Sequence, residues 1–232
     1  MMRPISILLL VMLCVASARA HHGKEFFLTA TSRTPERGDL IGLLSLERVP
    51  SLLATSVEPG ILYGFTNLWS GEIHLHVNDV SSRFSLEAIG FEQRFFLYDG
   101  SAQEHATPFN AGALMEFEKG IGGNPDRLDV RGMISGEFQP FEAALNLGYS
   151  RSLSTGETPS LEYAVGAKYA FLPSLSLGVE LTGDLRHPSN SSLTPGLYVG
   201  LGGGVQARLG ASFAQTARTT QTTVRLSFVS EF

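Results

Sequence analysis

The chain has 232 residues, enough for one domain, with 22 acidic against 17 basic side chains and a formal net charge of −5. An acidic chain without a basic patch is not expected to bind nucleic acid. The single cysteine, Cys14, excludes disulfides, and the 25 glycines accompany a chain in which no stretch keeps a helical period.

The first twenty residues have the order of a secretory signal peptide. Arg3 supplies the positive charge, residues 5–15 are apolar, and Ala18-Arg19-Ala20 is a small-x-small cleavage site. The apolar run is shorter than the roughly 20 residues that a membrane-spanning helix needs. We therefore expect residues 1–20 to be removed and Cys14 to be lost with them.

Residues 21–38 follow the cleavage site. Within them, residues 26–33 look strand-like and precede a turn at residues 35–38. The rest of the sequence predicts a β-barrel with an even number of strands, and an extra strand here would make that number odd. We therefore predict that residues 21–38 form a periplasmic extension or a plug in the barrel lumen. His21 and His22 at the new amino terminus could bind copper or zinc weakly.

From residue 39 to the end, short segments alternate apolar and polar residues. The clearest is residues 71–78, where Ile73, Leu75 and Val77 share one face and Glu72, His74 and His76 share the other. The same alternation recurs in residues 141–150, 161–169, 175–182, 205–213 and 223–228. A soluble sandwich could also alternate in this way, but alternation around the whole chain favours a closed sheet with a lipid-facing exterior.

Strands are predicted at residues 40–49, 57–65, 71–78, 83–98, 109–119, 127–137, 141–150, 160–171, 175–184, 193–201, 205–214 and 222–232. Twelve is an even number, and short turns then alternate with longer loops, as in outer-membrane barrels. Residues 99–108 are an exception, because this long connection falls on the short-turn side. The alternation also changes near Ile89-Gly90, which predicts a β-bulge or a misplaced boundary.

The predicted fold is thus all-β, a transmembrane antiparallel up-and-down β-barrel over residues 39–232, with about twelve strands and ten or fourteen as alternatives. The last strand alternates Val224, Leu226 and Phe228 and ends in the aromatic Phe232. This pattern is typical of the C-terminal signal that the outer-membrane barrel assembly machinery captures by strand addition, although Ser230 occupies one position where an apolar residue is usual.

Residues 21–26, residues 63–67 leading into residues 72–76, residues 177–181 and the C-terminal strand carry a resemblance to a known family. The chain resembles uncharacterised outer-membrane barrels of proteobacteria, which are loosely akin to barrels encoded beside phenol-degradation pathways. The resemblance implies an outer membrane of a Gram-negative bacterium, with its lipids and lipopolysaccharide as neighbours. It implies no activity.

Charged residues collect on the predicted lumen face. The candidates are Glu72, His74, His76, Glu162, Lys168, Glu180, Arg208 and Arg225. Mixed charge predicts either paired networks that narrow or close a channel, or a pathway that selects cations. His74 and His76 beside Glu72 could meet a metal, but they do not make four ligands, so no metal or cofactor is assigned.

His187-Pro188-Ser189-Asn190 is similar to the His-x-Ser-Asn motif of outer-membrane lipid-modifying esterases. Continuing the preceding strand by twos would aim His187 and Ser189 toward lipid, but Pro188 is ill placed within such a strand. We assign no catalytic residue. The leading hypothesis is a narrow passive pore for small solutes or ions, and the alternatives are this esterase and a closed structural barrel that binds a partner.

Overall fold

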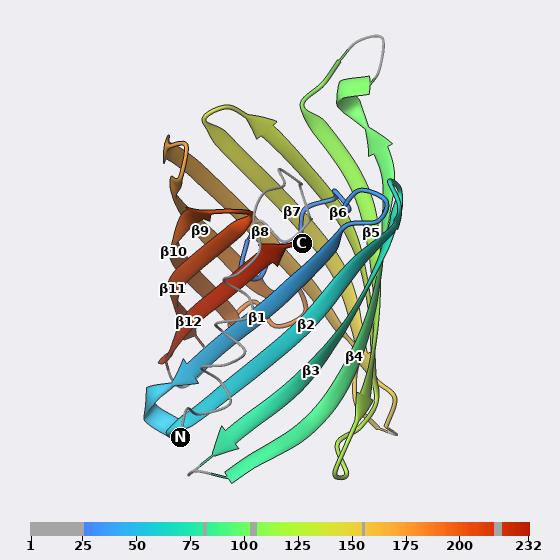
Figure 1. Cartoon of the computed structure of the whole chain (residues 1–232). Coiled ribbons are helices and arrows are strands. Elements are labelled where there is room, and N and C mark those ends of the chain that lie inside the picture. Colours follow the sequence, from blue (N-terminus) through green and yellow to red (C-terminus); the bar gives the residue numbers. More distant parts are fainter. Residues whose placement is uncertain (1–25, 81–82, 103–105, 155, 216–219) are drawn as a thin grey trace.

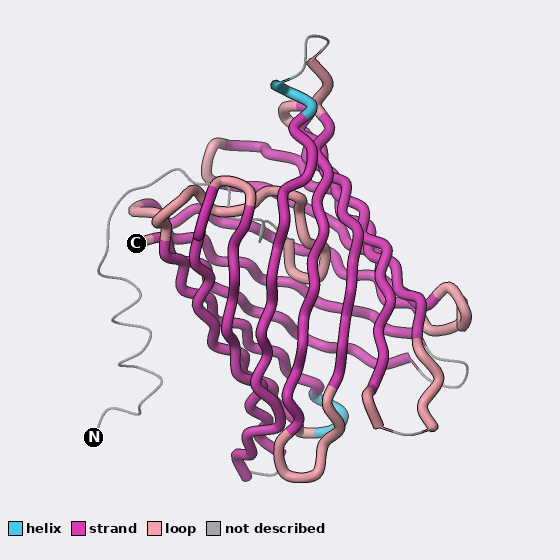
Figure 2. Tube along the Cα trace, turned by 90° about the vertical axis from the view of Figure 1, so that its right-hand side faces the viewer, coloured by secondary structure: helices cyan, strands magenta, loops and turns pink. Residues whose placement is uncertain are grey.

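Twelve antiparallel strands close into one barrel in the computed structural model, which describes residues 26–80, 83–102, 106–154, 156–215 and 220–232. Each strand pairs with its neighbours in sequence, and β1 pairs with β12 (Figure 1 and Figure 2). The strands are β1 (Leu40–Val49), β2 (Ala54–Thr66), β3 (Trp69–Val80), β4 (Arg83–Asp99), β5 (Phe109–Gly120), β6 (Arg127–Phe138), β7 (Phe141–Ser152), β8 (Ser160–Leu172), β9 (Leu175–Asp184), β10 (Ser191–Gly202), β11 (Val205–Gln215) and β12 (Thr220–Glu231). The predicted twelve-stranded up-and-down barrel is confirmed.

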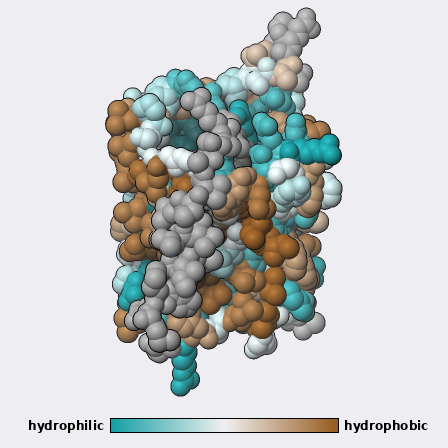
Figure 3. All heavy atoms as spheres, viewed as in Figure 1, coloured by the Kyte–Doolittle hydropathy of each residue, from teal (hydrophilic) through white to brown (hydrophobic). Residues whose placement is uncertain are grey.

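The apolar faces of the strands point outward. On β3, Ile73 is 55% exposed, whereas its neighbours Glu72 and His74 are each 3% exposed. A soluble sandwich would show the reverse, because it buries its apolar face. Hydrophobic residues accordingly cover much of the outer surface (Figure 3). Among the residues that the structure describes, no helix has the length and hydropathy to span a membrane.

Strand β4 contains the predicted bulge. His76 lies opposite Ala88 while Val77 lies opposite Leu86, so Glu87 is an extra residue in the ladder. The bulge falls two residues before Ile89, and it turns the alternation so that Glu92 and Arg94 face the lumen. A second register shift occurs at Leu97, between the positions paired with β5.

The two ends of the barrel differ in their connections. Tight turns at residues 67–68, 139–140, 173–174 and 203–204 lie at the end where β1 begins and β12 finishes (Figure 1). Gly202, Gly203 and Gly204 all have positive φ, and these glycines form one of the tight turns. The β4–β5 connection, with the short 3₁₀ turn η2 (Gly100–Ala102), projects from this end and remains the exception.

Residues 26–35, which precede β1, lie inside the barrel. Phe26, Thr29 and Ser32 are at most 2% exposed although they belong to no strand. We call residues 26–37 the lumen segment. They contact inner-face side chains of several strands, whereas residues 1–25, including His21, His22 and the predicted cleavage site, lie outside the described residues.

Candidate functional site in the barrel lumen

All eight candidate lumen residues lie on the inner face of the barrel. Four are buried, namely Glu72, His74, Glu180 and Arg208. The others, His76, Glu162, Lys168 and Arg225, are partly exposed within the lumen. The alternation of side chains along each strand is sufficient to explain this placement, because each of these residues lies within one of the alternating segments identified in the sequence.

Glu180 of β9 holds the lumen segment by its backbone. Its carboxylate accepts hydrogen bonds from the backbone N–H groups of Phe27, Leu28 and Thr29 at 2.7–2.8 Å, and from the Tyr198 hydroxyl at 3.0 Å. Three successive N–H groups around one anion form a small nest. The nest explains how a fully buried carboxylate is tolerated, since a buried charge is costly unless it is hydrogen-bonded.

Other strands anchor the same backbone. Asn146 of β7 exchanges two hydrogen bonds of 2.7 Å with the N–H and carbonyl of Ala30. Arg208 of β11 donates to the Phe26 carbonyl at 2.6 Å, and the Ser135 hydroxyl accepts from the Ser32 N–H at 3.1 Å. Sequence alternation puts Asn146 on the inner face, but nothing in the sequence indicates that it or Ser135 binds the lumen segment.

Small residues make space for the lumen segment. A Cβ atom at Gly64 would lie 2.0 Å from the carbonyl oxygen of Glu36, and one at Gly166 would lie 2.9 Å from the Phe26 ring. Phe26 also meets Tyr198 edge to face at 6.2 Å between centroids. The barrel wall is thus fitted to the segment in shape as well as in hydrogen bonding.

The lumen segment lies between two cavities. A cavity of about 370 Å³ is lined by Leu28 together with Asn146, Glu162 and Asp184. A second cavity, of about 240 Å³, is lined by residues of the lumen segment and by charged side chains. We call it the acidic cavity, because its lining includes Glu47, Glu58, Glu92, Glu116 and Glu118 but only two basic residues, Arg94 and Arg131.

Many of the lumen charges are paired. Arg225 contacts Glu47, Arg94 contacts Glu92, and Lys168 lies 2.7 Å from Glu142. Arg127 lies 3.2 Å from Asp129 and 3.5 Å from Glu162. This is the mixed-charge network expected from the sequence, with an acidic excess in one half of the lumen.

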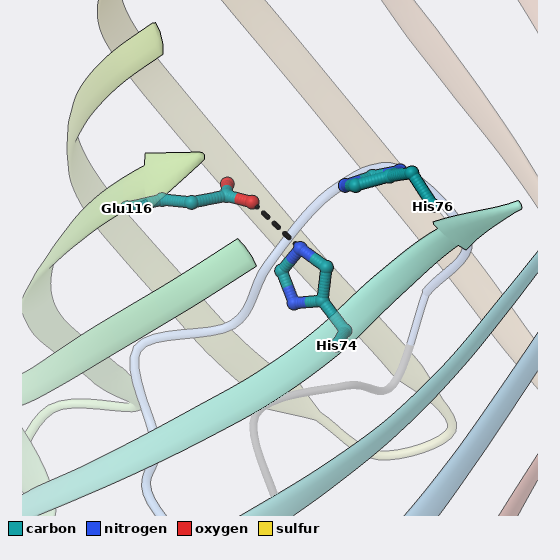
Figure 4. A group of neighbouring side chains, drawn as sticks. All are labelled: His74, His76 and Glu116. Atoms are coloured by element: carbon teal, nitrogen blue, oxygen red, sulfur yellow. Dashed lines mark ion pairs between the residues drawn. The ribbon is translucent and has the colours of Figure 1, made fainter. Parts of the chain in front are cut away.

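Two histidines, His74 and His76, lie among carboxylates in the acidic cavity. Figure 4 shows them with one of these carboxylates, Glu116. His74 Nε2 lies 3.0 Å from Glu116 and its Nδ1 lies 3.2 Å from Glu72. His76 lies 3.5 Å from both Glu58 and Glu118. The sequence brings only Glu72 next to the histidines. The other three carboxylates come from β2 and β5 through the pairing of β2, β3, β4 and β5.

The His187 motif lies outside the strands. β9 ends at Asp184, and the Asn190 N–H donates to the His187 carbonyl at 2.8 Å to close a turn containing Pro188 and Ser189. His187 Nδ1 contacts Asp184 at 3.1 Å. Because the segment is a turn, alternation by twos does not continue through it. The argument that aimed both side chains at lipid is therefore wrong.

The C-terminal residues lie on the outer face. Val224 and Phe232 are 41% and 43% exposed, and Leu226 and Phe228 follow the same alternation. The Phe232 N–H donates to the Leu40 carbonyl at 2.9 Å, which extends the closing pair of strands by one residue.

Aromatic side chains gather on the outside at the tight-turn end. The ring centroids of Phe65 and Trp69 are 4.6 Å apart, and those of Phe141 and Tyr169 are 4.9 Å apart. Aromatic girdles of this kind mark the membrane interface of outer-membrane barrels.

A closed twelve-stranded barrel with an apolar exterior and a charged lumen has the fold of the porin-like outer-membrane barrels. Solved structures support this class. The chain is similar to KdgM porin, with 13% identity and a TM-score of 0.62 over 83% of this chain and 99% of that chain. It is also similar to an outer membrane channel from Pseudomonas putida F1, with 10% identity and a TM-score of 0.58 over 87% and 98% of the two chains.

The Acinetobacter baumannii outer membrane protein Omp33 is a third similar structure, with 12% identity and a TM-score of 0.56 over 84% of this chain and 98% of that chain. No protein-family model and no curated protein matches the sequence. At these identities the likeness establishes the fold.

Proposed function

We propose that the mature chain is an outer-membrane pore through which small solutes or ions pass down their concentration gradient. The observation that carries the proposal is the closed barrel with an apolar belt outside and charged cavities inside. Lipid-facing strands and a polar interior are the arrangement that a water-filled channel requires. The fold likeness to KdgM porin and to other outer-membrane channels supports the same function.

The proposed route begins with removal of residues 1–20 and export across the inner membrane of a Gram-negative bacterium. Capture of the last strand by the barrel assembly machinery would then insert the chain among outer-membrane lipids and lipopolysaccharide, with the tight-turn end toward the periplasm. The kinship with barrels encoded beside phenol-degradation pathways stays a prediction.

We further propose that the pore prefers cations. The acidic cavity has five carboxylates against two guanidinium groups, and rings of carboxylates favour cations in channels. The lumen segment would narrow the pathway, because it crosses the lumen between the two cavities. This role would be the plug alternative that the sequence predicts for residues 21–38.

Planar-bilayer recording tests both statements. We expect discrete conductance steps from purified, folded protein. Under a KCl gradient, the reversal potential should lie closer to the equilibrium potential of K⁺ than to that of Cl⁻. A variant that lacks residues 21–37 should conduct several times more current. If the wild-type barrel is silent and this variant conducts, the closed structural barrel that binds a partner becomes the better hypothesis. If both are silent, the pore is wrong.

We propose no catalytic role. The turn that holds His187 and Ser189 gives the esterase alternative no support, and an assay of acyl-chain release by the wild type and Ser189→Ala would revive it only if the wild type were active.

A further inference from the structure

We infer that the acidic cavity binds a divalent transition-metal ion of the zinc class, with His74, His76 and Glu116 as ligands. One donor atom from each of the three side chains lies within 4.8 Å of the other two. All three side chains point toward one another across the inner wall (Figure 4). Two imidazoles and one carboxylate form a donor set that suits zinc and its neighbours, whereas calcium and magnesium prefer oxygen alone.

The sheet is built to bring these residues together. His74 and His76 belong to β3 and Glu116 to β5, and β4 runs between them. The β4 residues directly opposite the histidines are Gly90 and Ala88, the two smallest available. A Cβ atom at Gly90 would lie 2.0 Å from His74 Nε2. The imidazole therefore reaches over β4 to Glu116 only because position 90 has no side chain.

His74 has the surroundings of a metal ligand on both ring nitrogens. Its Nε2 lies 3.0 Å from Glu116 Oε1, while its Nδ1 lies 3.2 Å from Glu72 Oε1. The side chain is 4% exposed, yet neither nitrogen meets hydrogen-bond geometry. Histidine ligands commonly direct the second nitrogen at a carboxylate, which fixes the ring. Glu72 is placed for that role, and Glu116 for direct coordination.

His76 can complete the set by a small movement. In tetrahedral zinc sites the donor atoms stand about 3.4 Å apart. The three donor atoms here lie within 4.8 Å of one another, so no pair must approach by more than about 1.4 Å. His76 lines the acidic cavity, and its side chain is 27% exposed, so its ring has room to turn. Glu58 and Glu118, each 3.5 Å from its ring, are placed to orient it or to supply a fourth oxygen.

Charge also favours a cation at this position. The two imidazoles are surrounded by four carboxylates, those of Glu58, Glu72, Glu116 and Glu118. The carboxylate of Asp129 lies close to those of Glu116 and Glu118. Arg94 and Arg131 are the basic residues lining the cavity, and Arg94 contacts Glu92. A divalent ion would offset the acidic excess of the cavity in which both imidazoles lie.

Calorimetric titration of Zn²⁺ into the folded, detergent-solubilised barrel tests the site without requiring that the barrel conduct. We expect one tight, saturable site, distinct from the weak binding expected of His21 and His22 at the amino terminus. His74→Gln and His76→Gln should each weaken binding by more than about tenfold. Losing only an outer partner of a metal ligand already weakens binding by about tenfold or more, and these variants remove a ligand itself. Gly90→Ala should also weaken binding, although it removes no ligand.

The matched control is His187→Gln, which makes the same chemical change at a histidine paired with an acid outside the lumen. It should bind like the wild type. Folding of each variant is verified by its heat-modifiable migration in electrophoresis. If the buried His74 variant does not fold, the partly exposed His76 and the Gly90 variant decide the result. The inference is overturned if the wild type does not bind Zn²⁺. It is also overturned if the folded His76→Gln and Gly90→Ala variants bind Zn²⁺ with the same affinity as the wild type.

A current recording separates this inference from the proposed pore. Zn²⁺ should reduce the wild-type current and leave the His76→Gln current unchanged. Binding by calorimetry from a barrel that carries no current supports the metal site and contradicts only the pore.

Discussion

At the scale of single residues, Glu180 accepts three backbone hydrogen bonds from the lumen segment. Its four hydrogen bonds depend on a group that only accepts. Glu180→Gln turns one oxygen into an NH₂ group that faces N–H donors. Each hydrogen bond to a charged group contributes about 1.5–3 kcal/mol, so we expect the segment to be released and the barrel to lose about 2–5 kcal/mol.

Limited proteolysis of residues 26–37 and the temperature of heat-modified migration measure this effect. Glu162→Gln is the control, because Glu162 receives a hydrogen bond from Ser160 and faces Arg127 rather than the lumen segment. Equal protease resistance in the two variants would contradict the role given to Glu180.

Glycine positions allow a second comparison. Gly64→Ala places a methyl group 2.0 Å from the Glu36 carbonyl oxygen, so the backbone of the lumen segment must move. Gly132→Ala meets nothing within 4 Å. Overpacking of this kind lowers the free energy of unfolding by roughly 1–3 kcal/mol. We therefore expect the first variant to unfold at a lower temperature and to expose the segment to protease. The second should behave like the wild type, and a reversed order would exclude this packing argument.

At the scale of elements, β12 closes the barrel against β1 and contains the residues predicted to form the assembly signal. Its pairs run from Ile41 opposite Glu231 to Arg48 opposite Val224. We expect Phe232→Ala to reduce the amount of folded barrel in the outer-membrane fraction several-fold, because the terminal strand is the edge that strand addition captures. The control is Phe84→Ala, which removes an outward aromatic ring that is 67% exposed. The prediction of an assembly signal at Phe232 is wrong if both variants assemble equally.

The strands themselves could be predicted closely from the sequence. Every predicted boundary lies within three residues of the observed one, and the change of alternation in β4 reflects a real bulge at Glu87. Residues 26–33 are different: they look strand-like but form no strand of the barrel. Because β1 and β12 already pair with each other, the closed sheet offers these residues no free edge, and their backbone is satisfied by side chains instead.

At the scale of the whole molecule, the apolar exterior predicts where charge is tolerated. Leu145 lies in the middle of β7 and is 37% exposed, whereas Leu185 lies in the β9–β10 loop and is 56% exposed. We expect Leu145→Arg to destabilise the barrel in a bilayer by about 2–4 kcal/mol and Leu185→Arg by no more than about 1 kcal/mol. Chemical unfolding from lipid vesicles measures both, and equal effects would contradict a membrane belt at Leu145.

Sequence alone determined which residues face inward and which outward, because a strand alternates its side chains with a fixed period of two. It therefore assigned the twelve strands, the apolar exterior and the charged lumen. It could not assign partners across the lumen. Glu180 meets Phe27, which is 153 residues away, and His74 meets Glu116, because the closed sheet and its bulge set how strands are staggered.

Tertiary structure also decided where alternation stops. The sequence around His187 continues a plausible pattern, yet β9 ends at Asp184 and the following residues turn. A strand ends where its neighbour no longer pairs with it, and pairing is a property of two segments. The period of the side chains belongs to the sequence; the staggering, the lumen contacts and the metal ligands that we infer belong to the closed barrel.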